Sequence, residues 1–263
     1  CPAIMKLSVS EMLATLTPRS AARCRSISTR SSGLPGSSVR RATLPTRIED
    51  AATIGYRMLV PVGKSRSASM EAEIARLTGL SAQTVSVIVR QLETDQLLIK
   101  ETPQRGKVGQ PLVPFSLNPD GAFSIGLKIG RRSGDLILLD LTRKVRRKVH
   151  QPYVFPTPQK IMDFVAVELE GLLSGLSPEQ KSRISGLGIA TPFELWNWEE
   201  EIGASHEVLE AWRDFDIAAE IAKLGGWPVH FSNDATAACA AELLFGRGNR
   251  FNSYAYFFVG YFV

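Results

Sequence analysis

The chain has 263 residues, of which 44% are apolar, so it is long enough for two ordinary domains that each bury a hydrophobic core. No apolar run reaches the roughly 18 residues of a membrane-spanning helix, and the first thirty residues lack the apolar core of a secretory signal. Three cysteines without CxxC spacing exclude a disulfide framework and a zinc knuckle. These features predict a soluble, cytoplasmic protein with no membrane partner.

The net charge of +5 is unevenly distributed along the chain. Residues 1–118 contain 16 Lys and Arg against 8 Asp and Glu, whereas residues 119–263 contain 15 against 18. A basic region attracts a polyanion such as DNA because binding releases counterions, which adds affinity without sequence preference. We therefore expect nucleic acid to bind the first part of the chain.

Residues 1–66 show little sign of a folded domain. Ser, Arg, Pro and Gly dominate this segment, and between Arg19 and Arg47 there are seven arginines and no acidic residue. We expect a disordered basic leader, which is either an arm that lies along DNA or sequence foreign to the native protein. Because the chain starts at Cys1 and stops at Val263 inside an apolar run, we also expect it to be a fragment.

Order is expected from residue 67, where two short helices follow each other. Residues 71–78 place Ile74 and Leu77 on one helical face, and a glycine then ends this helix. Ser81 caps a second helix, which continues to about residue 95 with apolar residues at the i, i+3, i+4 and i+7 positions of a buried stripe.

A basic β-hairpin is expected after the second helix. Residues 97–101 and 112–117 predict two strands, and the polar loop between them contains Gly106 with a cation on either side. The Asn-Pro-Asp-Gly turn at 118–121 marks a domain boundary. Two helices with a glycine turn, followed by a hairpin, predict a winged helix-turn-helix of the α+β class over residues 67–118.

The second helix and the hairpin supply the expected contacts to double-stranded DNA. A helix fits the major groove, where side chains near its N-terminus read base edges, while cations of a wing reach the minor groove or phosphates. Gln83 can pair with adenine, and Arg90 with guanine or phosphate. The residues predicted to bind DNA are Gln83, Thr84, Ser86, Arg90, Arg105 and Lys107. Each feature alone is more typical of a solvated surface, and it is their order along the chain that favours DNA binding.

The pattern changes after residue 118, where three strands are followed by alternating helices and strands. The three strands are joined by short connections, so we expect them to be antiparallel. The expected elements are strands at 123–129, 135–141 and 145–153, a helix at 158–173, a strand at 184–190, one or two helices between 206 and 224, a strand at 229–232, a helix at 234–245 and a strand from 253. This order predicts an α/β domain over 119–263, with a mixed sheet of the actin-like or ribonuclease-H-like class.

Three motifs together resemble the ROK family of bacterial repressors, open reading frames and sugar kinases. They are the helix pair at 73–86, the wing at 105–111 and the run at 232–242, with the strand and loop at 186–192 between the last two. They occur in the family's order and spacing. The resemblance covers about residues 70–263 and implies a sugar-kinase-type domain after the winged helix.

The resemblance implies a transcriptional regulator of carbohydrate metabolism, usually a repressor, whose binding to DNA responds to a sugar or sugar-derived effector. Members usually form homo-oligomers. The family pattern places Asn233 and Asp234 in the effector site, where Asn233 bonds sugar hydroxyls and Asp234 matches the general base of the kinase members. Without the resemblance, an Asn and an Asp directly before a helix are ordinary helix caps.

Two departures from the family pattern affect the expected chemistry. Kinase members open the domain with an Asp-x-Gly-x-Thr-like turn that holds phosphate and magnesium, but here Lys128 stands in place of the aspartate and Arg131 and Arg132 follow it. An ammonium group cannot hold magnesium, so we predict no enzyme activity, no catalytic residues and no metal site. The alternative is an ATP-dependent sugar kinase with an appended DNA-binding domain.

The second departure is the end of the chain. The family continues into a glycine-rich loop, further sugar ligands and a His/Cys zinc site, all of which lie beyond residue 263. We therefore expect only the first lobe of the sugar-kinase-type domain, truncated at its C-terminus, and no cofactor in this fragment.

Overall fold

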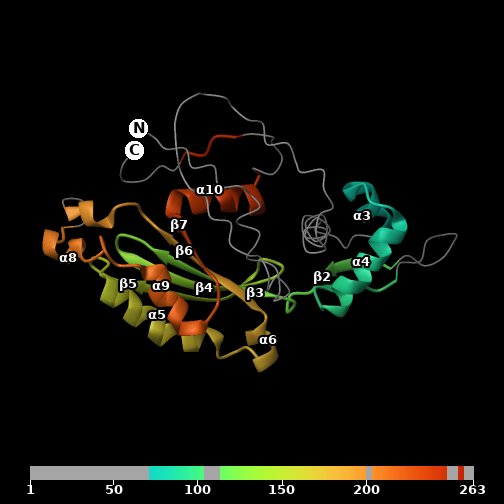
Figure 1. Cartoon of the computed structure of the whole chain (residues 1–263), viewed down its shortest axis with the longest axis horizontal. Coiled ribbons are helices and arrows are strands. Elements are labelled where there is room, and N and C mark those ends of the chain that lie inside the picture. Colours follow the sequence, from blue (N-terminus) through green and yellow to red (C-terminus); the bar gives the residue numbers. More distant parts are fainter. Residues whose placement is uncertain (1–70, 104–112, 200–202, 248–253, 258–263) are drawn as a thin grey trace, which may run out of the picture. The chain divides into compact units, whose positions relative to one another are not determined.

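The computed structural model describes residues 71–103, 113–199, 203–247 and 254–257 (Figure 1). The chain divides into two compact units, residues 1–116 and 117–263. In the described ranges, no helix is both long and apolar enough to cross a membrane. The predictions made for residues 1–66, and for Arg105 and Lys107, fall outside the described residues.

The described part of the first unit contains two helices, α3 (Glu71–Thr78) and α4 (Ala82–Thr94). Gly79 joins them with a φ of +72°, a left-handed conformation that glycine adopts without strain, and its N–H donates to the Ala75 carbonyl over 2.9 Å. Ser81 caps α4, because its hydroxyl accepts a hydrogen bond of 3.1 Å from the Thr84 N–H. The glycine turn and the serine cap are therefore both as predicted.

A two-stranded sheet, β1 (Leu98–Lys100) and β2 (Phe115–Leu117), completes the described part of the first unit. Seven hydrophobic residues in the described part of this unit are buried. They are Ile74, Val85, Val89, Leu92, Leu97, Leu98 and Phe115. Leu77 lies about 60° around α3 from Ile74 and remains 52% exposed, so the buried stripe of α3 is narrower than the sequence predicted.

The second unit is built on a five-stranded sheet with the order β5-β4-β3-β6-β7. Its strands are β3 (Phe123–Ile129), β4 (Ser133–Asp140), β5 (Val145–Pro152), β6 (Ile184–Thr191) and β7 (Val229–Asn233). β3, β4 and β5 are antiparallel neighbours, while β6 lies parallel to β3 and β7 parallel to β6. Three antiparallel strands followed by crossover strands confirm the predicted mixed sheet.

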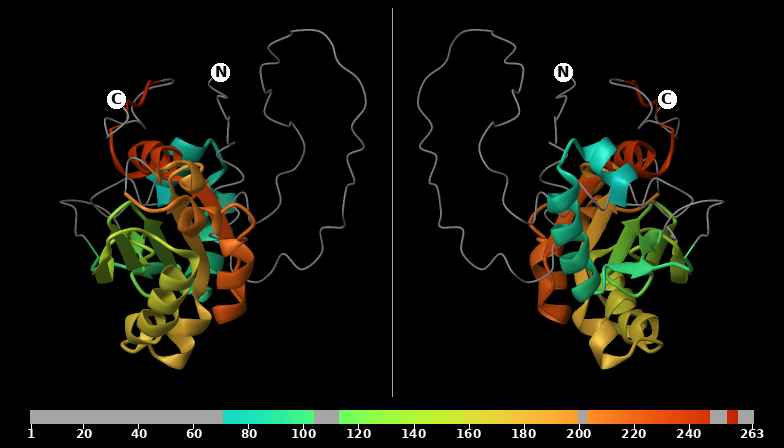
Figure 2. Two further views of the ribbon diagram at one scale, coloured as in Figure 1. Left: turned by 90° about the vertical axis from the view of Figure 1, so that its left-hand side faces the viewer. Right: turned by 90° about the vertical axis from the view of Figure 1, so that its right-hand side faces the viewer.

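Helices cover both faces of this sheet (Figures 1 and 2). α5 (Pro158–Leu173) packs on β4 and β5 and contacts α9 (Ile217–Gly225), which packs on β7. α10 (Asp234–Phe245) lies on the opposite face, against β6 and β7. Three shorter helices lie in the connections, namely α6 (Pro178–Ser182), η2 (Leu195–Asn197) and α8 (His206–Glu210).

The core of the second unit lies between the sheet and α5. Alternate residues of β3 and β4 are buried, as expected for strands whose side chains point to opposite faces. Thr157 caps α5 and Pro158 is its first residue, and the helix buries its apolar side, which includes Ile161 and Val165. Residues 254–257 have no regular structure, so the strand predicted from residue 253 is not found there, and the rest of it lies outside the described ranges.

Candidate functional site

The three parallel strands β3, β6 and β7 end at the same edge of the sheet. Lys128 near the end of β3 pairs with Ala190 of β6, and Thr191 of β6 pairs with Asn233 of β7. Open α/β sheets commonly bind ligands at the carboxyl ends of their parallel strands. The pairing therefore brings Lys128, Thr191 and Asn233 to the edge of the sheet where the effector residues were predicted.

Asn233 is a helix cap in this structure. Its side-chain oxygen accepts hydrogen bonds from the N–H groups of Ala235 at 3.0 Å and Thr236 at 3.3 Å, and its side-chain nitrogen donates to the Thr191 carbonyl at 3.5 Å. The cap that the residue type predicts is therefore present. The same contacts hold the amide at the junction of β7 and α10, where Asp234 follows it.

Asp234 is the first residue of α10 and is half-buried. Its Oδ1 accepts a hydrogen bond of 2.8 Å from the Ala235 N–H, and within the described part of the chain Oδ2 has no protein partner. A carboxylate at a helix N-terminus is stabilised by the helix dipole, and its second oxygen can accept a hydrogen bond from a hydroxyl group.

Thr191 is a residue of this site that the sequence reasoning did not single out. It is one of two buried polar residues in the described part of the chain, and its carbonyl accepts the hydrogen bond from Asn233. The sequence feature that could have identified Thr191 is its position, because it is a polar residue at the end of an apolar strand and directly before a proline.

The turn after β3 follows Lys128 closely and is closed by hydrogen bonds within the protein. The Gly130 N–H donates to the Ser133 carbonyl at 2.9 Å, and a Cβ at Gly130 would lie 3.0 Å from that oxygen. The Tyr153 hydroxyl donates to the Gly130 carbonyl at 2.8 Å, and the Arg132 guanidinium donates to the Val154 carbonyl. Burial raises the pKa of Tyr153 above its ordinary value, so its phenol remains a donor at neutral pH.

The position of Lys128 offers no carboxylate for a magnesium ion. Lys128 is exposed, and its partner across the antiparallel pair is Asp135. Asp135 Oδ1 is held by Lys148 Nζ and His150 Nδ1, each at 2.9 Å. Burial acts to raise the pKa of Asp135, but these hydrogen bonds and charges outweigh it and lower the pKa.

No metal site is apparent in the described residues, which contain no group of three or more His, Cys, Asp or Glu side chains able to hold an ion. Magnesium prefers carboxylate and phosphate oxygens, and an ammonium repels it. The donor set at the end of β3 therefore does not fit the magnesium of a kinase.

The candidate DNA-binding residues of α4 lie on its exposed side. Gln83 and Arg90 are exposed and Ser86 is half-buried, on the side of the helix opposite the buried Val85 and Val89. Thr84 is exposed at the margin of this face, and its hydroxyl lies 2.8 Å from the Ser81 hydroxyl. The structure thus brings together four of the six predicted residues, and the other two, Arg105 and Lys107, lie outside the described residues.

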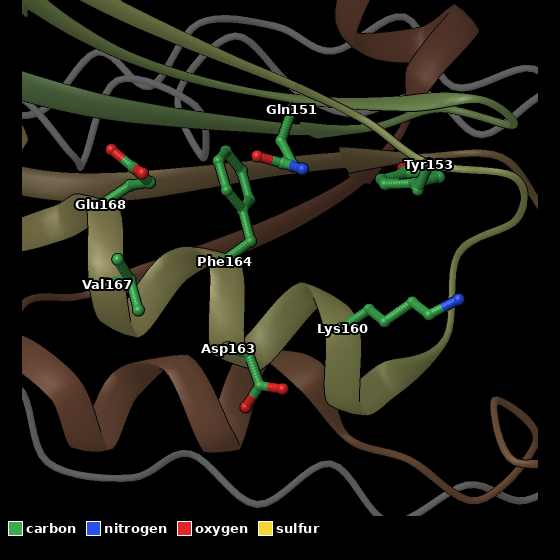
Figure 3. A pocket seen from close by; sticks show the side chains of 7 residues that line it. All are labelled: Gln151, Tyr153, Lys160, Asp163, Phe164, Val167 and Glu168. Carbon is green, nitrogen blue, oxygen red and sulfur yellow. The ribbon is translucent and has the colours of Figure 1, made fainter.

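A separate hollow of about 330 Å³ lies between β5 and α5 (Figure 3). Its lining residues are Gln151, Tyr153, Lys160, Asp163, Phe164, Val167 and Glu168. Figure 3 shows Gln151 and Phe164 approaching each other across the gap between the strand and the helix. None of the residues predicted to bind DNA or an effector lines this hollow.

An ion-pair cluster joins the segment after η2 to α8. His206 pairs with Glu199, and Arg213 pairs with Glu210 and stacks over the ring of Trp196 at 5.5 Å from its centroid. The hydrogen bond to Glu199 is the largest cause of a raised His206 pKa. The exposed positions of His206 and Arg213 make this a surface cluster that orders a connection.

Comparison with known sequences finds a match to a protein-family model and a similar repressor protein. The ROK family model matches residues 124–261, just over half of the chain. A xylose repressor from Bacillus spizizenii is 23% identical over 203 residues, which cover 77% of this chain and 52% of that protein. The chain therefore spans about half the length of the curated relatives it matches.

Comparison with solved structures finds both regulators and kinases. One is a ROK family transcriptional regulator, a homologue of the Escherichia coli MLC protein, with 19% identity and a TM-score of 0.49 over 73% of this chain and 48% of that chain. Another is the ROK hexokinase from Thermus thermophilus, with 24% identity and a TM-score of 0.35 over 47% of this chain and 38% of that chain. On the evidence of the family match over residues 124–261, the chain belongs to the ROK family.

Proposed function

We propose that the chain is part of a sequence-specific DNA-binding regulator of carbohydrate metabolism, which acts as a repressor and responds to a sugar or sugar-derived effector. The exposed side of α4 carries this proposal, because Gln83 and Arg90 present base-reading groups opposite the buried Val85 and Val89. α3, Gly79, α4 and the β1–β2 pair follow each other in the order of a winged helix-turn-helix.

The likeness to a repressor supports the same proposal for the first unit. The 203 matched residues of the xylose repressor exceed the length of residues 117–263, so the match extends into the unit that carries α4. A sugar kinase has no need of an exposed, polar helix in an additional N-terminal unit. The repressor likeness therefore favours a regulator with an attached sugar-kinase-type sensor.

The effector site of this proposal is the carboxyl edge of β6 and β7. Asn233 and Thr191 are joined there, and Asp234 keeps one carboxylate oxygen available to a hydroxyl. Sugars are recognised by amides and carboxylates that bond their hydroxyl groups. We assign the contacts to a sugar to Asn233 and Asp234.

A sugar kinase with an appended DNA-binding unit is the competing function. Asp234 favours it, since a half-buried carboxylate at this place in the fold matches the general base of kinase members. Lys128 opposes it, because an exposed ammonium stands where a magnesium-binding carboxylate is needed. The proposed protein therefore binds a sugar and does not phosphorylate it.

Two measurements on the purified protein test this function. In gel-shift assays with pooled genomic fragments at low salt, we expect retention of particular fragments and their release by one member of a panel of pentoses and hexoses. The absence of binding to any double-stranded DNA contradicts the proposal. A coupled assay for ATP-dependent phosphorylation of the same sugars is expected to show no turnover, and turnover at rates typical of enzymes favours the kinase.

We further propose that the full-length protein acts as a homo-oligomer. A dimer allows two recognition helices to read two half-sites one helical turn apart. Sedimentation equilibrium of the full-length protein is expected to give a mass of at least two chains, and a strict monomer at working concentrations contradicts this.

A further inference from the structure

The turn before β5, together with β5 itself, concentrates positive charge on a unit that is acidic overall. Five of the six residues from 143 to 148 are Arg or Lys, although residues 119–263 contain 15 basic and 18 acidic residues. No acidic residue occurs between Asp140 and Asp163. The side chains from 142 to 148 are all exposed. We name residues 143–148 the basic ribbon.

Of the five cations of the basic ribbon, Arg146 and Lys148 are neutralised by carboxylates, whereas Lys144 and Arg147 have no carboxylate partner in the described residues. Arg146 binds Asp120 at 2.9 Å and Asp140 at 3.2 Å, and Lys148 binds Asp135 at 2.9 Å. Arg147 donates to the neutral hydroxyl of Ser174 at 3.0 Å. In the part of the chain that the structure describes, neither Arg147 nor Lys144 has a carboxylate partner. The charges of Lys144 and Arg147 therefore remain uncompensated at an exposed surface.

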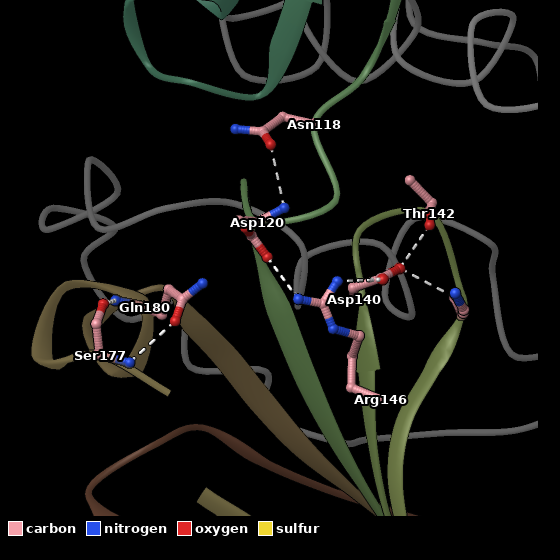
Figure 4. A network of polar contacts seen from close by, with 8 residues as sticks. Asn118, Asp120, Asp140, Thr142, Arg146, Ser177 and Gln180 are labelled. Atoms are coloured by element: carbon pink, nitrogen blue, oxygen red, sulfur yellow. Dashed lines mark hydrogen bonds and ion pairs between the residues drawn. The ribbon is translucent and has the colours of Figure 1, made fainter. Parts of the chain in front are cut away.

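Arg146 fixes where this surface lies within the second unit (Figure 4). Figure 4 shows its guanidinium between Asp120, just before β3, and Asp140 at the end of β4. Asp140 also accepts hydrogen bonds from the Thr142 hydroxyl at 2.6 Å and the Lys144 N–H at 3.0 Å, which shape the turn. The basic ribbon is thus held beside Asp120, at the end of the unit where the chain arrives from β2.

The effector residues lie at the opposite end of the same sheet. Asn233 ends β7 and Thr191 ends β6, both parallel to β3, whose first residue Phe123 pairs with Asp140. The second unit therefore has one end suited to a sugar and another end that is basic and adjoins the chain from the first unit. The proposed sugar site and the basic ribbon therefore do not overlap.

We propose that the basic ribbon is a second DNA-contacting surface, which binds phosphates without reading sequence through Lys144 and Arg147. This inference rests on the proposed function, because it adds a DNA contact of the second unit to the proposed DNA contacts of α4. Charge complementarity supports DNA as the occupant, since an exposed ammonium group in the turn before β5 and an exposed guanidinium group on β5 can each bind a phosphate. An anionic membrane is a poorer match, because the described basic ribbon offers no amphipathic helix that would enter a bilayer surface.

The test compares two double variants in fluorescence anisotropy with a long, mixed-sequence DNA duplex over a series of KCl concentrations. Removing one cation that binds a phosphate reduces the slope of log K against log salt by about 1, so Lys144→Ala with Arg147→Ala is expected to reduce the slope by about 2. The control, Lys160→Ala with Lys223→Ala, removes the same charge from α5 and α9 and is expected to leave the slope unchanged. The charge-conserving pair Lys144→Arg with Arg147→Lys is expected to keep the parent slope, which separates charge from folding.

The outcomes separate this inference from the proposed function. If the parent chain binds no double-stranded DNA at low salt, the proposed function fails and this inference fails with it. If the parent binds DNA but the alanine pair keeps the parent slope, only the basic ribbon is excluded. If the alanine pair loses binding to phosphatidylserine vesicles while its DNA slope equals that of the parent, the surface is assigned to membranes and the inference is overturned.

Discussion

Asn233 and Thr191 are register partners in the parallel β6–β7 pair, and the Asn233 side chain joins them by donating to the Thr191 carbonyl at 3.5 Å. The same side chain caps α10 through its oxygen. One amide therefore connects the end of β6 to the start of α10 at the proposed effector site.

Substitution of Asn233 separates its capping role from its proposed sugar contact. Asn233→Ala removes the cap and is expected to lower the free energy of unfolding by about 0.5 to 2 kcal/mol, whereas Asn233→Ser keeps a capping oxygen and most of that stability. Both variants are expected to lose affinity for the sugar, measured by isothermal titration calorimetry. If Asn233→Ser binds sugar as the parent does, Asn233 is a cap only.

Substitutions in the first unit are expected to distinguish base reading from phosphate binding. Gln83→Ala should weaken binding to the cognate operator by about 1 to 3 kcal/mol and leave random DNA unaffected, because alanine cannot bond a base edge. Lys107→Ala should weaken cognate and random DNA alike. Competition gel shifts measure both, and equal losses for Gln83→Ala on the two kinds of DNA would remove Gln83 from the reading face.

Arg146 forms ion pairs with both Asp140 and Asp120, and we call these two contacts the Arg146 clamp. The two ion pairs are expected to contribute differently to the free energy of unfolding. The Asp140 side chain is only 1% exposed, so Arg146→Met removes the counter-charge of a buried carboxylate and is expected to lower the free energy of unfolding by about 1 to 3 kcal/mol. Asp120→Asn breaks the exposed half and is expected to cost less than about 1 kcal/mol. Urea unfolding monitored by circular dichroism measures both values, and equal losses contradict the clamp.

The raised pKa of His206 gives a pH dependence with a definite sign. Because the hydrogen bond to Glu199 favours the charged imidazolium, the His206 pKa lies above 6.5. The stabilisation from this pair is fully present below 6.5 and is lost as the pH rises through the folded-state pKa. Proton NMR titration is expected to show a large fall of the His206 pKa in Glu199→Gln. A smaller fall is expected in Glu210→Gln, because the native Glu210 acts on His206 only through its charge. No change in Glu199→Gln excludes the pair in solution.

The sheet and the long helices of the second unit follow from local sequence patterns. Alternation of apolar residues predicts β3, and Thr157 followed by Pro158 predicts the start of α5 at the residue where it begins. The short helices α6 and η2 were not predicted, because three to five residues show no helical period.

The site was predictable only where its residues are neighbours in the sequence. Asn233 and Asp234 precede a helix and were recognised as a cap or a ligand pair. The bond from Tyr153 to Gly130 and the clamp from Arg146 to Asp120 join residues 23 and 26 positions apart, and only the packing of three strands brings them together. Residue spacing carries no information on such contacts.

The outermost position of β5 has a consequence for the behaviour of the protein in concentrated solution. In the described sheet, β5 has a strand on one side only, and such a strand is a template for pairing with another molecule. Arg147 lies on this strand and, among the described residues, has no carboxylate partner, so two copies that met side by side there would bring like charges together and repel each other. Arg147, which we assign to phosphate binding, therefore also opposes aggregation, and a neutral substitution there is expected to reduce solubility.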